Sequence, residues 1–184
     1  MALPCDLGDP EAVGRTLDSL RDATGGGPDV VVNNAGAFFI APAHDTSVRQ
    51  FGDMLAVNLT APFAVVRALL PAMRVKGRGH IVTIGSIADR ATFPGNAAYA
   101  ASKYGLRALH EVLRAELRGT GVRASLVSPG AVDTELWDPI DPDRQPGFTP
   151  RASMLAPEAV ADAVHYVVTA PEFLNVDELR LSRS

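Results

Sequence analysis

The sequence lacks several features that would direct it to particular classes of protein. Its single cysteine, Cys5, excludes an internal disulfide and fits a reducing compartment. Its 17 Lys and Arg residues are outnumbered by 21 Asp and Glu residues, so the net charge of −4 offers no basic surface for nucleic acid. No uninterrupted apolar run approaches a membrane span, and the N-terminus has no signal-peptide pattern. These absences predict a cytoplasmic protein without nucleic-acid or membrane partners, and no metal site is predicted.

Short apolar runs alternate along the chain with amphipathic helical patterns. The 184 residues are 47% hydrophobic and contain no internal repeat, which predicts one domain over residues 1–184 with a substantial core. The alternation predicts an α/β fold with buried parallel strands. Asp9-Pro10 is a plausible helix start, and Pro62 should kink the long second helix. The expected strands are 29–32, 80–85, 123–127 and 178–181, and the expected helices are 9–23, 48–74, 97–118 and 156–169.

The stretch Tyr99-Ala-Ala-Ser-Lys103 places a phenol and an ammonium group one helical turn apart. Residues at i and i+4 lie on the same helix face, so both side chains can reach one site. A fixed lysine charge favours the phenolate and lowers the tyrosine pKa toward the working range of a general acid and base. The alternative is a chance pairing on an amphipathic helix.

Three of the predicted strands end in small or polar residues. The carboxyl ends of parallel strands meet at one edge of a sheet, where open α/β sheets bind ligands. We therefore expect these residues to gather beside Tyr99 and Lys103. They are Asn33-Asn34-Ala35-Gly36 after strand 29–32, Ser86 after strand 80–85, and Ser128-Pro129-Gly130 followed by Val132 and Thr134 after strand 123–127.

As a joint pattern, these residues resemble the short-chain dehydrogenase/reductase family, from about Cys5 to the C-terminus. The resemblance implies a Rossmann-like, doubly wound parallel sheet with helices on both faces. It also implies an oxidoreductase that transfers a hydride between NAD or NADP and a small-molecule alcohol or carbonyl substrate, since no side chain can supply a hydride. Its long helices often form a dimer contact in the family, which implies a homodimer or homotetramer. The motifs that carry the resemblance are Asn33-Asn34-Ala35-Gly36, Asn58, Ser86, Tyr99 with Lys103, and Pro129-Gly130 with Thr134.

The resemblance assigns a role to each catalytic position. Tyr99 would pass the proton to or from the substrate oxygen, while Lys103 lowers its pKa and hydrogen-bonds the nicotinamide ribose. Ser86 would polarise the carbonyl, because hydride transfer builds negative charge on oxygen. Asn58 would hold a water that links Lys103 to solvent. The implied cofactor-binding residues are Asp6, Asn33, Ala35, Gly36, Tyr99, Lys103, Pro129, Gly130, Val132 and Thr134, the last on the nicotinamide carboxamide.

Local structural roles stay open for several of these residues. Asn58 could be a helix residue that hydrogen-bonds locally, and Ser86 could be a helix N-cap. Asn33 and Asn34 could be ordinary turn residues. The complete pattern favours the functional interpretation for Ser86.

The family's phosphate-binding turn, Gly-x-x-x-Gly-x-Gly, has no counterpart in this sequence. The stretch 1–6 resembles the end of the family's third strand, with Asp6 at the position that touches adenine. Gly25-Gly26-Gly27 comes before a strand, whereas a pyrophosphate site follows a strand and opens a helix. We therefore expect an incomplete version of a longer enzyme, lacking the family's first two strands and helices. The residues that distinguish NAD from NADP would lie in that missing part.

The missing strands should leave residues 2–5 without partners and turn strand 29–32 into an open edge. Three consecutive valines on such an edge favour pairing with another chain. This supports a second hypothesis, a non-catalytic fragment that acts as an interaction module.

Residues 133–153 form a long irregular connection beside the expected site. Such a segment is often a functional lid, and the resemblance implies that it covers the substrate. Trp137, Leu136 and Phe148 are candidate substrate contacts, although a simply packed loop fits the sequence equally well.

Overall fold

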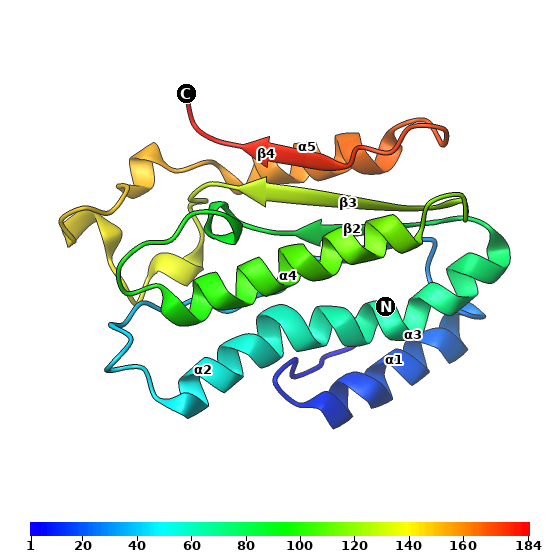
Figure 1. The fold of residues 1–184 in the computed structure, drawn as a ribbon, viewed down its shortest axis with the longest axis horizontal. Coiled ribbons are helices and arrows are strands. Elements are labelled where there is room, and N and C mark those ends of the chain that lie inside the picture. Colours follow the sequence, from blue (N-terminus) through cyan, green and yellow to red (C-terminus); the bar gives the residue numbers. More distant parts are fainter.

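The computed structural model describes residues 1–184 and contains one four-stranded parallel sheet in the order β1-β2-β3-β4 (Figure 1). Every neighbouring pair of strands is parallel. The strands are β1 (Val30–Asn33), β2 (Gly79–Ile84), β3 (Val122–Pro129) and β4 (Glu178–Leu181). The helices are α1 (Pro10–Thr24), α2 (Val48–Leu55), α3 (Ala61–Lys76), α4 (Ala97–Glu116) and α5 (Pro157–Thr169). The predicted α/β architecture is confirmed, and the predicted elements are present within a few residues of their expected bounds, except that the predicted helix 48–74 is divided into α2 and α3.

Helices cover both faces of the sheet. Ile81 of β2 packs into an apolar cluster with residues of α1, α3 and α4, whereas Val82 packs with Val167 of α5. Successive strand residues point to opposite faces, so α1, α3 and α4 lie on one side of the sheet and α5 on the other (Figure 1). This is the doubly wound arrangement that the resemblance implies.

The start of α1 follows the predicted capping chemistry. The Asp9 carboxylate accepts a hydrogen bond from the backbone N–H of Glu11 at 2.9 Å, and Pro10 occupies the first helical turn. Gly25 ends the helix with a φ of 64°, a left-handed conformation that glycine adopts without strain.

The long second helix is interrupted just before Pro62. We predicted one kinked helix, but the structure has α2 and α3 joined by a π-helical turn, Ala56–Thr60. Pro62 falls in the first turn of α3, where its missing N–H is tolerated. The wider turn directs Asn58 into the protein interior, where it is buried.

The helical run Val48–Lys76 has a stretch with mean hydropathy 1.5, so length and composition alone would allow it to cross a membrane. Asp53 and Arg67 interrupt the run, as the sequence indicates. Its apolar residues have another use, because Leu69 and Met73 are buried in the cluster that packs on the sheet.

The amino-terminal side of the sheet is open. Residues 1–6 form no strand, as expected for a segment without partners, and β1 pairs only with β2. Val30 and Val32 remain 39% and 43% exposed, because they point to the face that α5 does not reach at this edge. The prediction of an exposed valine edge is confirmed.

Candidate active site

The start of α4 and the end of β2 bring the predicted catalytic groups together. Lys103 is only 5% exposed, and its Nζ donates a hydrogen bond to the Ile84 carbonyl at 3.1 Å. That nitrogen lies 5.8 Å from the centroid of the Tyr99 ring. The Tyr99 phenol also lies beside Ser86: burial raises the pKa of Tyr99, and the Ser86 side chain partly offsets that rise. Tyr99, Lys103 and Ser86 therefore share one site at the carboxyl end of β2, as predicted.

The net direction of the Tyr99 pKa differs from the sequence prediction. Burial raises the pKa of Tyr99 above its usual value, and the Asp89 carboxylate raises it further, against the opposing effect of Ser86. Burial also lowers the pKa of Lys103 to about 8, although Asp89 counteracts this effect. The predicted lowering by Lys103 is wrong for this structure, because the ammonium points to a backbone carbonyl and both groups are desolvated.

Ser86 has the helix N-cap role considered for it, while its role in polarising a carbonyl stays a prediction. Its backbone is extended, and its Oγ accepts a hydrogen bond from the N–H of Ala88 at 3.1 Å. Ser86 thereby caps the short 3₁₀ helix Ile87–Asp89. The N-cap contact fixes the hydroxyl while the same side chain reaches Tyr99.

Asn58 connects two distant parts of the chain. Its Oδ1 accepts from the N–H of Ala37 at 2.8 Å, and its Nδ2 donates to the Ala37 carbonyl at 2.9 Å and to Ser102 Oγ at 3.0 Å. Ser102 in turn donates to the Tyr99 carbonyl at 2.7 Å. Asn58 is therefore not a helix residue with only local hydrogen bonds. Its proposed role in holding water stays a prediction.

The predicted cofactor residues after β1 lie on the open side of the sheet. Asn33 Nδ2 is buried without a hydrogen-bond partner, and Asn34 makes a local turn by donating its N–H to the Val32 carbonyl at 3.1 Å. Ala35 and Gly36 are exposed. A Cβ on Gly36 would lie 3.2 Å from Asn58 Oδ1 and 4.0 Å from Lys103 Nζ, so this backbone adjoins Lys103.

Asp6 lies apart from the catalytic groups. Its exposed carboxylate accepts a hydrogen bond from the N–H of Gly8 at 2.8 Å, which forms a turn before α1. The neighbouring Leu7 lines the same groove beside β1 as Asn33 and Asn34.

The predicted cofactor residues after β3 lie on the opposite side of Ser86 in the sheet. Pro129 is the last residue of β3, and the N–H of Gly130 donates to the Leu181 carbonyl at 2.8 Å. Val132 forms an isolated bridge with Leu155, which ties the start of the irregular segment to its end. Thr134 precedes a short 3₁₀ helix, Glu135–Trp137.

An aromatic wall extends from Tyr99 into the irregular segment 133–153. The Phe38 ring lies 4.8 Å from the Tyr99 ring and 5.0 Å from the Trp137 ring, each measured between centroids. Phe148 follows at 6.4 Å from Trp137. Leu136, in contrast, is largely exposed. Trp137 and Phe148 thus lie near the site as expected, whereas nothing in the packing associates Leu136 with it.

Sequence reasoning missed Phe38 and Asp89. Phe38 follows Asn33-Asn34-Ala35-Gly36 in an apolar loop, and its proximity to that motif was a usable signal. Asp89 is a fully buried carboxylate that accepts a hydrogen bond from Ser128 Oγ at 2.6 Å. Its burial depends on contacts across the sheet, which have no local sequence signal.

Comparison with known proteins decides the family. The family model described as short chain dehydrogenase matches residues 1–145. The chain belongs to this family. An uncharacterized oxidoreductase of Staphylococcus saprophyticus is 36% identical to this chain over 154 residues, which are 82% of the chain and 63% of that protein. The uncharacterized oxidoreductase YbbO of Escherichia coli is also 36% identical, over 167 residues that cover 88% of the chain and 62% of YbbO.

Solved structures of other family members share the fold. A metagenomic short-chain oxidoreductase in complex with NADP has 32% identity and a TM-score of 0.81, with 100% of this chain and 74% of that chain covered. Serine dehydrogenase from Escherichia coli has 32% identity and a TM-score of 0.78, with coverage of 95% and 72%. The chain spans a little under two thirds of the length of the two curated relatives.

Proposed function

We propose that the protein carries the catalytic site of an NAD(P)-dependent oxidoreductase that interconverts an alcohol and a carbonyl compound. The observation that carries the proposal is the convergence of Tyr99, Lys103 and Ser86 at the carboxyl end of β2. These groups supply a proton donor, a buried cation and a hydroxyl in one place, which is the donor set that a developing alkoxide requires.

The chain's own residues would handle the proton and the substrate oxygen. Tyr99 donates the proton to that oxygen in reduction and removes it in oxidation. Ser86, held by the Ala88 N–H, adds a second hydrogen bond to the same oxygen. Lys103 supplies a buried ammonium beside the Tyr99 ring, and the Asn58–Ser102 connection keeps the first turn of α4 in place.

The residues present fit the nicotinamide-ribose half of the cofactor. Lys103 and Tyr99 can hydrogen-bond the hydroxyls of the ribose, and the backbone of Gly36 adjoins Lys103. The buried side-chain amide of Asn33 has an unused donor. Val132 and Thr134 follow β3, the strand that pairs with β2. The pyrophosphate half finds no glycine turn between a strand and a helix. When bound, NAD or NADP would supply or accept the hydride.

The aromatic wall indicates the kind of substrate. Phe38, Trp137 and Phe148 form an apolar surface next to the Tyr99 ring. We infer that the carbonyl compound carries an apolar or aromatic substituent that packs on these rings. Arg151, which contacts Asp133 and Asp138 within the same segment, holds the lid that bears Trp137.

The first test is a thermal shift with NADH and, separately, with NADPH. Saturation at about a hundred times Kd adds roughly 2.7 kcal/mol to the stability of the native state. We expect a rise with one of the two cofactors, followed by turnover in a screen of aldehydes and ketones. Cooperative melting without any rise would contradict cofactor binding by this chain.

We also place the activity in the cytoplasm, within a single domain, in a homodimer or homotetramer. Support for assembly comes from the outer surfaces of α3 and α4, where Phe63, Tyr104 and Val112 are 48%, 41% and 56% exposed. Sedimentation velocity of the purified chain tests the oligomeric state, and a monomer at all concentrations would contradict it.

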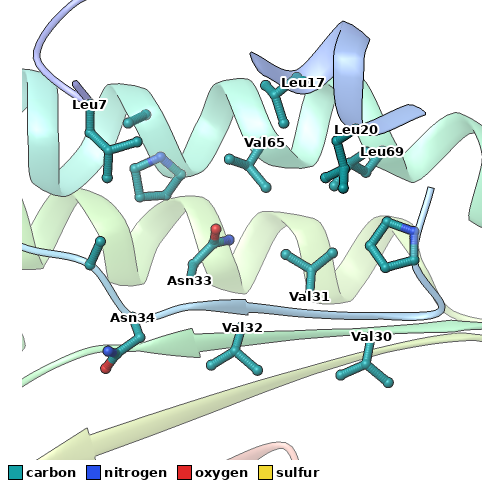
Figure 2. A pocket seen from close by; sticks show the side chains of 14 residues that line it. Leu7, Leu17, Leu20, Val30, Val31, Val32, Asn33, Asn34, Val65 and Leu69 are labelled. Carbon is teal, nitrogen blue, oxygen red and sulfur yellow. The ribbon is translucent and has the colours of Figure 1, made fainter. Parts of the chain in front are cut away.

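A second candidate function rests on the open edge at β1. A cavity of about 290 Å³ lies between this strand, α1 and α3, and is lined mainly by apolar side chains. Figure 2 shows Val31 and Asn33 pointing toward α3, while Val30 and Val32 point to the other side of the strand. An added strand would pair with the free edge of β1 and cover this cavity, so the chain would act as an interaction module.

The same thermal-shift experiment separates the two functions. A folded chain whose melting temperature stays the same with both cofactors, but which associates as its concentration increases, supports the interaction module. A chain that binds cofactor and turns over substrate supports the oxidoreductase.

A further inference from the structure

Asp89 is a buried carboxylate that lies directly behind the Ser86 loop. One of its oxygens accepts a hydrogen bond from Ser128 Oγ of β3 at 2.6 Å and a longer one from the N–H of Ser86 at 3.4 Å. The other oxygen accepts from Arg90 Nε at 2.6 Å. Charge-assisted hydrogen bonds on both oxygens hold a buried carboxylate in one orientation.

Gly85 leaves no free space around this carboxylate. A Cβ at position 85 would lie 2.6 Å from Ser128 Oγ and 2.7 Å from Asp89 Oδ2. The end of β2, the end of β3 and Asp89 are therefore in direct contact immediately before Ser86. The position of the Ser86 hydroxyl depends on this contact.

A chain of charges leads from Asp89 to the far strand of the sheet. Arg90 contacts Asp89 and also Glu178 of β4, and all three side chains are at least partly buried. Glu178 lies beyond Arg90, so its charge is separated from the site by the guanidinium.

Tyr99 and Lys103 are the titratable groups of α4 that respond to Asp89. Burial raises the pKa of Tyr99 and the Asp89 charge raises it further, whereas burial lowers the pKa of Lys103 to about 8 and the Asp89 charge opposes that effect. Two other charged groups lie near this carboxylate: Arg90, on the same turn, and Glu178, on β4. His110 lies farther along α4 and contacts Thr83 instead.

We propose that Asp89 is a positioning residue that holds the Ser86 loop against β3 and presents a fixed negative charge to Tyr99 and Lys103. Its charge keeps the phenol protonated and the lysine cationic, which prepares the site to donate a proton in carbonyl reduction. The consequence for catalysis rests on the proposed function, whereas the position and charge of Asp89 do not.

The charge can be tested without cofactor or substrate. The sequence has 3 tyrosines, so Tyr104→Phe and Tyr166→Phe together leave Tyr99 as the single phenol. Its ionisation is followed by the ultraviolet absorbance of the phenolate, over the pH range in which circular dichroism stays native. In this background Asp89→Asn should lower the titration midpoint of Tyr99 by about one pH unit, because a nearby like charge is removed.

Glu178→Gln is the matched control. It removes a carboxylate from the same ion-pair chain but keeps the charge at Asp89, so the Tyr99 midpoint should stay within error of the parent. A purely structural role for Asp89 would change the stability of both variants and leave the phenol titration alone. An unchanged midpoint in folded Asp89→Asn, or an equal change in Glu178→Gln, would overturn the proposal.

Asp89→Asn leaves Arg90 with one buried partner fewer and could prevent folding. The double variant Asp89→Asn/Arg90→Gln is then compared with Arg90→Gln alone, so that the two proteins differ only in the Asp89 charge, and the Tyr99 midpoint should be lower in the double variant. A chain that binds no cofactor still gives the titration, so failure of the proposed function and failure of this inference are distinguishable. In an active enzyme, Asp89→Asn should also move the pH profile of alcohol oxidation to lower pH.

Discussion

The carboxyl end of β2 and the free edge of β1 differ in how many of their polar groups are hydrogen-bonded within the protein. Around Ser86, buried polar atoms have partners from distant segments: Asn58 uses both ends of its amide, and Asp89 uses both oxygens. Along β1, Val30 and Val32 are exposed and the amide nitrogen of Asn33 is buried without a partner.

This difference indicates where the protein's own residues satisfy the local hydrogen-bonding groups. Apart from Arg90 Nη2, which is buried without a partner, the network of Asn58 and Asp89 is paired, and such pairing favours one arrangement of the side chains. An unpaired edge, in contrast, accepts any strand that offers backbone hydrogen bonds. The chemistry of the proposed site is therefore held in place by this chain, while the side that would bind the rest of a dinucleotide stays open.

The largest expected effect is a loss of turnover caused by a substitution in the site at the carboxyl end of β2. Tyr99→Phe removes the proton donor but leaves the ring that packs on Phe38, so folding should be unchanged. Turnover should fall by about 10²- to 10⁴-fold, the usual contribution of a general acid and base. Steady-state kinetics measures this, with the exposed Tyr104→Phe on the same helix as control. Near-normal turnover of Tyr99→Phe would refute the assignment.

Two histidines behind the site are expected to make the fold acid-sensitive. His80 and His110 are buried, each with one ring nitrogen bonded to a hydroxyl and the other unpaired. Burial, together with Arg123 for His80 and Arg114 for His110, lowers the pKa of each to about 4. The unfolded chain binds the extra protons, so stability should fall as the pH drops from about 6.5 to about 4, by up to ~3 kcal/mol per histidine.

Urea unfolding at several pH values measures this slope. His80→Gln should make it shallower, because one of the two protonation differences is removed. His44→Gln, on an exposed side chain, should leave it unchanged. Equal slopes for the parent and His80→Gln would contradict the explanation.

The tight contact at Gly85 predicts a moderate loss of stability. The added methyl group of Gly85→Ala would meet Ser128 and Asp89, and such overpacking costs about 1–3 kcal/mol. Gly52→Ala in α2 is the matched control, because its Cβ meets nothing within 4 Å and should gain about 0.5–1 kcal/mol in a helix. Denaturant unfolding compares the two, and a stable Gly85→Ala would mean that the Ser86 loop can move.

The smallest expected effect lies at the open edge. Val32→Lys places a charge on β1 and should weaken association through that edge without changing the core, because Val32 is already 43% exposed. Sedimentation velocity should detect a smaller associated fraction than in the parent. Val75→Lys, on an exposed valine of α3, is the control. Equal association of both variants would exclude β1 as the contact.

Local patterns predicted the elements and the catalytic pair, because capping, periodicity and i,i+4 spacing act over a few residues. Asp9 and Pro10 start α1 as predicted, and Tyr99 with Lys103 lies on one helix beside Ser86. The pKa of Tyr99 was mispredicted because spacing does not reveal desolvation. Asn58 was ambiguous because its partners, Ala37 and Ser102, are far away in the sequence.

The shape of the long helix was only partly predictable for the same reason. Pro62 predicts an irregularity in the helix, but the form of that irregularity depends on the tertiary contacts of the preceding turn. The aromatic wall likewise needs Phe38 and Trp137 to meet across the site, and no sequence window contains both.

The π-helical turn between α2 and α3 has a consequence for insertions and deletions in this protein. Each residue of a helix advances its neighbours by about 100° around the axis, so losing one residue from Ala56–Thr60 would rotate everything on one side of the turn relative to the other. Either Asn58 would leave Ala37 and Ser102, or α3 would turn its apolar side away from the sheet. The helical run from α2 to α3 must therefore keep its residue count.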